Sequence, residues 1–119
     1  MMLFEGESKY ILTEKKLQIS KIPSFIIDSY NKEEILLQTN IKPSESLLKI
    51  SKINIDTLRE FYDNEHVMIT SGNEMYVELQ KEGKIKKVHL HCYYNEQIGY
   101  LVSLLNDLIP KKYKIMYDK

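Results

Sequence analysis

The sequence predicts an α+β protein. We expect an antiparallel sheet of about six to seven strands, with one long C-terminal helix and a shorter central helical segment packed on one face. The C-terminal third carries this prediction, because residues 84–119 read as a strand, an amphipathic helix, a stop and a closing strand. A second observation is a self-consistent hairpin pattern over residues 74–91. With 119 residues, the chain is expected to form a single domain spanning residues 1–119.

The C-terminal helix is predicted to begin at Asn95, whose side-chain oxygen can cap the first turn. It is predicted to end near Ile109, because Pro110 disfavours a helical conformation in the residue before it. Its apolar residues follow a 3.6-residue period: Ile98, Leu101, Val102, Leu105, Leu108 and Ile109. After Pro110, residues 113–117 alternate with a period of two, which predicts a short edge strand.

The hairpin prediction rests on Glu82-Gly83 as a turn. If Lys81 pairs with Lys84, Tyr76 lies opposite His89 and Glu78 lies opposite Lys87. One face is then apolar: Met75, Val77, Leu79, Val88, Leu90 and Cys92. The other face is polar and aromatic: Tyr76, Glu78, Gln80, Lys87, His89 and His91.

The N-terminal third is predicted to be mostly strand. Residues 8–22 are expected to form a hairpin and residues 24–29 a third strand. Residues 33–41 favour a fourth strand, although a short helix starting near Lys32 is an alternative.

Helix signals follow the fourth strand. Pro43-Ser44 is a helix start, and Asp56 is expected to cap a further turn or two extending to Tyr62. Residues 66–71 then read as a strand that ends in a Gly72-Asn73 turn.

Composition limits the functional classes. Lysine plus arginine equals aspartate plus glutamate, 17 against 17, so no global charge favours nucleic acid or an acidic membrane. Cys92 is the single cysteine, which excludes an internal disulfide. The start of the chain lacks the pattern of a signal peptide, and no segment has the ~20 apolar residues that span a bilayer. We therefore expect a cytoplasmic protein without a membrane partner.

Two histidines on one strand raise the alternative of a metal site. His89-Leu90-His91 places two imidazoles on the same strand face, and His66 is a candidate third ligand. Such a domain would bind metal or act as a small metal-dependent enzyme. The competing interpretation is that these histidines are solvated, or hydrogen-bonded to Tyr76 and Glu78.

The chain shows no enzyme motif. His91 and Cys92 are adjacent on a strand and point to opposite faces, so they form no catalytic pair. Glycines are scattered singly, without a phosphate-binding loop or a nucleophile elbow. We predict a non-enzymatic protein without a cofactor.

Two lysine clusters provide a further alternative, nucleic-acid binding. They lie at residues 84–87 and 111–114, near tyrosines on which bases can stack. The alternative is that these lysines only occupy a turn and an edge strand. We therefore regard nucleic acid as the less favoured partner.

The leading hypothesis is a protein-binding module. An exposed face of aromatic and charged residues is typical of protein interfaces. The candidate partner-binding residues are Tyr76, Glu78, Lys87, His89, His91 and Tyr93.

The C-terminal pattern resembles that of a known group of proteins. Tyr93-Tyr94, a helix, Pro110-Lys111-Lys112-Tyr113, Ile115 and Tyr117-Asp118-Lys119 are similar to the tails of small uncharacterised bacterial proteins. This resemblance covers about the last third of the chain and implies a fold rather than an activity. The small size and many tyrosines also resemble immunity proteins, which bind and block a cognate toxin, in type only.

Overall fold

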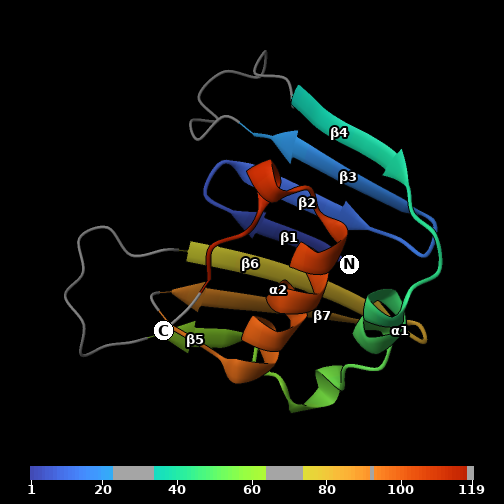
Figure 1. The fold of residues 1–119 in the computed structure, drawn as a ribbon. Helices are drawn as coiled ribbons and strands as arrows, with labels where there is room; N and C mark the ends of the chain where they lie inside the picture. Colours follow the sequence, from blue (N-terminus) through green and yellow to red (C-terminus); the bar gives the residue numbers. More distant parts are fainter. Residues whose placement is uncertain (23–33, 64–73, 92, 118–119) are drawn as a thin grey trace.

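The computed structural model describes residues 1–22, 34–63, 74–91 and 93–117, whose strands form one seven-stranded sheet (Figure 1). The strands are β1 (Met2–Glu5), β2 (Ser8–Leu12), β3 (Lys16–Lys21), β4 (Glu34–Asn40), β5 (Phe61–Asp63), β6 (Glu74–Lys81) and β7 (Lys84–His91). Their spatial order is β4-β3-β2-β1-β6-β7-β5. All neighbours are antiparallel except β5 and β7, which are parallel. The predicted fold class is confirmed.

Both helices lie on the same face of the sheet, as predicted (Figure 1). These are α1 (Glu45–Ser51) and α2 (Glu96–Leu108), and α2 crosses the strands while packing against α1. Asn95 caps α2, since its Oδ1 accepts a hydrogen bond from the Ile98 amide at 3.0 Å. Leu101 and Leu105 are fully buried between the helix and the sheet. The core therefore lies between α2 and the strands.

The predicted register of the β6–β7 hairpin is confirmed. Tyr76 lies opposite His89, and Glu78 lies opposite Lys87. The turn residues Glu82 and Gly83 have φ values of 51° and 80°, as the favoured two-residue hairpin turn requires. The apolar face is buried at every described position that was predicted: Met75, Val77, Leu79, Val88 and Leu90.

The N-terminal hairpin of β2 and β3 and the strand β4 are also confirmed, as is the helix start at Ser44. The structure adds β1, which the sequence analysis did not predict. β1 pairs with β2 on one side and with β6 on the other, so it lies near the middle of the sheet.

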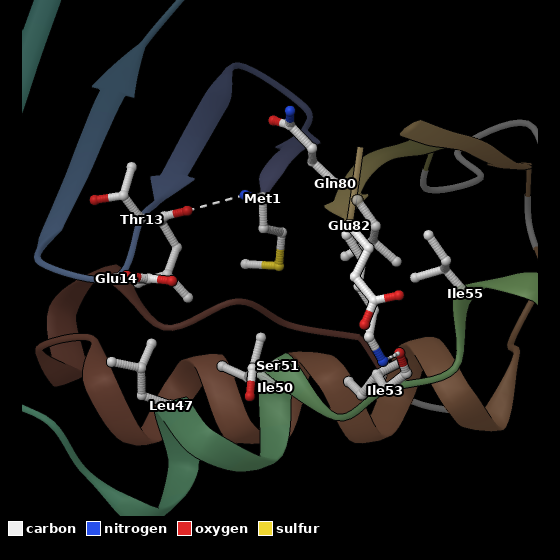
Figure 2. A pocket seen from close by; sticks show the side chains of 13 residues that line it. Met1, Thr13, Glu14, Leu47, Ile50, Ser51, Ile53, Ile55, Gln80 and Glu82 are labelled. Carbon is white, nitrogen blue, oxygen red and sulfur yellow. Dashed lines mark hydrogen bonds between the residues drawn. The ribbon is translucent and has the colours of Figure 1, made fainter. Parts of the chain in front are cut away.

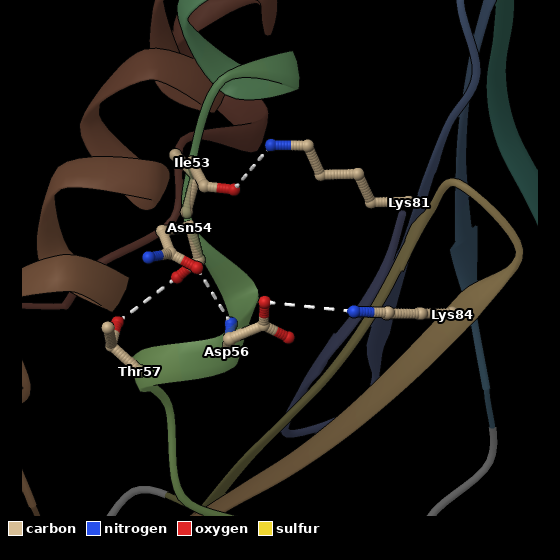
Figure 3. Close-up of polar contacts among 6 residues, drawn as sticks. All are labelled: Ile53, Asn54, Asp56, Thr57, Lys81 and Lys84. Atoms are coloured by element: carbon tan, nitrogen blue, oxygen red, sulfur yellow. Dashed lines mark hydrogen bonds and ion pairs between the residues drawn. The ribbon is translucent and has the colours of Figure 1, made fainter.

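The prediction of helix from Asp56 to Tyr62 is wrong beyond a single 3₁₀ turn, η1 (Ile55–Thr57). The cap of this turn is Asn54, whose Oδ1 accepts a hydrogen bond from the Asp56 amide at 3.0 Å (Figure 3). The chain then extends into β5, where Tyr62 is buried and Phe61 is exposed. Pairing with β7 outweighs the local helical signal.

The predicted closing strand over residues 113–117 is wrong too. Here the chain forms a 3₁₀ turn, η2 (Lys111–Tyr113), and then runs without regular structure. Ile115 is nevertheless buried, and its backbone is paired with the side chain of Asn106 rather than with a strand. The predicted strands at 24–29 and 66–71 and the Gly72-Asn73 turn lie outside the described residues.

Candidate functional site

Four aromatic side chains cross the sheet on the face opposite the helices. Each comes from a different neighbouring strand, in the order β1, β6, β7 and β5: Phe4, Tyr76, His89 and Phe61. They are direct cross-strand partners, so the pairing register itself aligns them. We call these four residues the aromatic row. The helices α1 and α2 lie on the other face of the sheet (Figure 1).

Three rings of the aromatic row, those of Tyr76, His89 and Phe61, pack against each other. The rings of Tyr76 and His89 are parallel, with centroids 4.2 Å apart and planes inclined by 6°. The Phe61 ring lies on the other side of His89, at 5.1 Å and tilted by 59°. At the far end, the Lys9 ammonium lies 5.8 Å from the centroid of Phe4. The His89 imidazole therefore lies between the rings of Tyr76 and Phe61.

Hydrogen bonds fix the two histidines of β7. His89 Nε2 lies 3.0 Å from Glu74 Oε1, and His91 Nδ1 lies 2.9 Å from Asp63 Oδ1. The alternative in which these histidines bond to Tyr76 and Glu78 is therefore wrong, because Glu74 and Asp63 are the partners and Tyr76 instead stacks on His89.

A hollow of about 1000 Å³ lies beside the aromatic row. Its apolar lining includes Phe4, Ile22, Tyr76 and Ile85, and its charged lining includes Glu60, Glu78 and Lys87. Three large side chains on this face are widely exposed, with Tyr76 at 45%, Phe61 at 53% and Ile85 at 58%. Glu78 and Lys87 lie opposite each other without forming an ion pair.

Four of the six predicted partner-binding residues line this hollow: Tyr76, Glu78, Lys87 and His89. His91 lies next to them on β7, bonded to Asp63. Tyr93 is not brought to the hollow. Its ring stacks on the buried Tyr62 at 5.0 Å, and its carbonyl accepts a hydrogen bond from the Tyr117 hydroxyl.

Sequence reasoning missed Phe4, Phe61 and Ile85. Phe4 and Phe61 were not identified because the strands that carry them, β1 and β5, were not predicted. Ile85 could have been predicted from the hairpin register, which the structure confirms and which places it on the same face as Lys87 and His89.

The two β7 histidines do not converge on a common point that a metal would occupy. Each is bonded to a different carboxylate, His89 to Glu74 and His91 to Asp63. Within the described ranges, no group of three or more histidine, cysteine, aspartate or glutamate side chains is arranged to hold a metal ion. His66 lies outside those ranges.

The two lysine clusters do not form one surface. Along β7 successive side chains alternate between faces, so Lys86 and Lys87 point to opposite sides of the sheet. Lys84 Nζ lies 3.9 Å from Asp56 Oδ2. Lys111 and Lys112 belong to η2, at a different end of the molecule (Figure 1).

None of the helices in the described ranges combines the length and the hydropathy needed to cross a membrane. Comparison of the chain with protein-family models, with curated proteins and with solved structures found no match.

Proposed function

We propose that the protein is a non-enzymatic, cytoplasmic protein-binding module and that the aromatic row and its hollow are its binding surface. The observation that carries the proposal is the exposure of Tyr76 and Phe61, two residues of this row, next to a hollow of about 1000 Å³. Tyrosine and phenylalanine are costly to leave in water and are enriched at protein interfaces. Exposed apolar patches of this kind commonly mark interaction sites.

The orientation of the rings favours a protein partner over nucleic acid. Base stacking needs a free ring face. In the row, one face of Tyr76 is covered by His89, and His89 lies between Tyr76 and Phe61. Ring faces that are stacked on each other are not available to bases, whereas the exposed parts of Tyr76 and Phe61 can pack against aliphatic and aromatic side chains of a partner.

The charges around the row favour a basic partner. Four carboxylates lie on or beside this face, those of Glu60, Asp63, Glu74 and Glu78. Two ammonium groups accompany them, those of Lys9 and Lys87. Complementary charge speeds association and selects partners. An immunity-type inhibitor that occludes a basic, apolar-lined cleft of a cognate toxin or enzyme fits this arrangement.

Site-specific photo-crosslinking tests this proposal in the native cell. A benzoyl-phenylalanine at position 76 should give one major protein adduct. The same group at position 100 is a matched control, since Tyr100 is also an exposed tyrosine, at 49%, but lies on α2. Equal adducts at both positions, or none at position 76, would refute the proposed surface.

The captured protein must then bind in purified form. We expect one-to-one binding that weakens at least tenfold with Phe61→Ala or Tyr76→Ala and is unchanged with Tyr100→Ala. If neither Phe61→Ala nor Tyr76→Ala weakens binding, the interface lies elsewhere on the protein. For an immunity-type role, the partner's own activity should be lost in the complex.

A further inference from the structure

A second hollow lies on the helix side of the sheet, away from the aromatic row. It encloses about 450 Å³ between α1 and the ends of β1, β2 and β6 (Figure 2). Its apolar lining includes Met1, Leu12, Leu47, Ile50, Ile53 and Leu79. This volume is within the usual range of small-molecule sites.

The hollow exists because α1 leans on α2 instead of packing down onto the strands. Ser46 Oγ donates a hydrogen bond to Asp107 Oδ2 at 3.1 Å, which links the two helices. α1 has no fully buried residue, although it carries Leu47, Leu48 and Ile50. Leu47 and Ile50 are half-buried and face the space that they leave unfilled (Figure 2). α1 thus covers an apolar space that lies between it and the strands.

Two cationic groups line this apolar space, the Lys81 ammonium and the Met1 α-ammonium, which donates a hydrogen bond to the Leu12 carbonyl at 2.9 Å. The Lys81 ammonium donates a long hydrogen bond, 3.4 Å, to the carbonyl of Ile53 (Figure 3). Within the described residues, no carboxylate lies at ion-pair distance from it. Glu14 and Glu82 also line the hollow, and both are exposed. A partly buried ammonium gains from an anionic acceptor far more than from a distant carbonyl.

We propose that this hollow binds a medium-chain carboxylic acid. The apolar tail occupies the space between α1 and the strands, where it contacts Leu47, Ile50 and Leu79. The carboxylate accepts hydrogen bonds from Lys81. The site is on the other side of the sheet from the aromatic row, so this inference does not depend on the proposed protein partner.

Decanoate, below its micellar concentration, is the probe for this site. In a ¹H–¹⁵N correlation titration, we expect saturable shifts of the Leu47, Ile50, Ile53 and Leu79 amides with one site per chain. Decanol has the same tail without the charge and should bind more weakly. Shifts confined to Phe4, Tyr76 and Ile85 would place the ligand on the other face and overturn the proposal, as would an absence of saturable shifts.

Three variants separate the contribution of the charge from that of the cavity. Lys81→Met should weaken decanoate about tenfold or more while leaving decanol binding unchanged. Ile50→Trp fills the space and should abolish binding of both, with thermal unfolding confirming that the variant folds. Lys21→Met, an exposed strand lysine outside the hollow, is the control and should change neither. Equal decanoate affinities of Lys81→Met and the parent protein would contradict the assignment.

Discussion

The imidazole of His89 stacks in parallel on the phenol ring of Tyr76, with 4.2 Å between the ring centroids. The two residues are opposite each other in an antiparallel pair, and the carboxylate of Glu74 holds the imidazole from the same strand as Tyr76. This arrangement restricts the side-chain rotamers of both rings before any partner arrives. A surface ordered in advance loses less entropy on binding.

A double-mutant cycle measures this stacking. Tyr76→Ala and His89→Ala should each destabilise the protein, and we expect a coupling free energy of roughly 0.5–1 kcal/mol between them. Urea unfolding of the parent protein, both single variants and the double variant gives the value. Tyr100→Ala combined with His89→Ala is the control and should be additive within about 0.5 kcal/mol. Additive behaviour of Tyr76 with His89 would show that the rings do not interact in solution.

Gly99→Ala is expected to destabilise the protein, although alanine has a higher helix propensity than glycine. Alanine normally stabilises a helix interior by about 1 kcal/mol relative to glycine. Here a methyl group on residue 99 would collide with the phenol of Tyr94, its carbon lying only 2.6 Å from the Cζ atom. We expect a loss of roughly 1–3 kcal/mol in the free energy of unfolding.

The matching test of this collision is Gly99→Ala in a Tyr94→Leu background. With the ring removed, the substitution should become neutral or stabilising, because only the propensity term remains. A stabilising effect of Gly99→Ala in the parent protein would contradict the close contact between the ring and the helix backbone.

Asn106→Ala should release the segment after η2. The Asn106 amide donates to the Ile115 carbonyl at 3.0 Å, and its oxygen accepts from the Ile115 amide at 2.8 Å. Losing both bonds should cost about 1–2 kcal/mol. Hydrogen exchange of the Ile115 amide should accelerate beyond the change expected from stability alone. Ser103→Ala, on the exposed side of α2, serves as the control.

Glu5→Gln should stabilise the protein at neutral pH. Half-burial of its carboxyl group raises the pKa of Glu5. The folded state therefore holds the proton more tightly than the unfolded chain, and stability is lost as pH rises through the folded-state pKa. We expect a gain of roughly a few tenths of a kcal/mol at pH 7, because water still reaches the group.

Urea unfolding at pH 4 and pH 7 tests the effect of Glu5. The advantage of Glu5→Gln should be present at pH 7 and shrink at pH 4, where the parent carboxyl becomes protonated. Glu7→Gln is the control, because Glu7 is exposed in the turn that follows Glu5. An advantage that is equal at both pH values would rule out titration of Glu5 as its cause.

The β6–β7 hairpin and α2 were predictable because their signals are local. The turn at Glu82-Gly83 fixes the register, and the apolar period of α2 is bounded by Asn95 and Pro110. Four of the predicted site residues came together for the same reason, since one register positions them all.

The parts that were missed depend on distant partners. β5 has three residues, and its helix-like spacing around Phe61 and Tyr62 gives way to parallel pairing with β7. Ile115 follows an alternating pattern, but a side-chain amide takes the place of a neighbouring strand. A sequence window around these residues contains neither partner, so local periodicity alone assigns them wrongly.

The position of β1 has a consequence for how the chain folds. One strand of four residues joins the meander of β2, β3 and β4 to the group of β5, β6 and β7. Its second partner, β6, begins only at Glu74, so the sheet becomes continuous only when residues as far apart in the sequence as Phe4 and Tyr76 have paired. Closing so long a loop is entropically costly and slows folding. Before β1 pairs with β6, the aromatic row is incomplete, because Phe4 and Tyr76 are direct partners across this pair of strands.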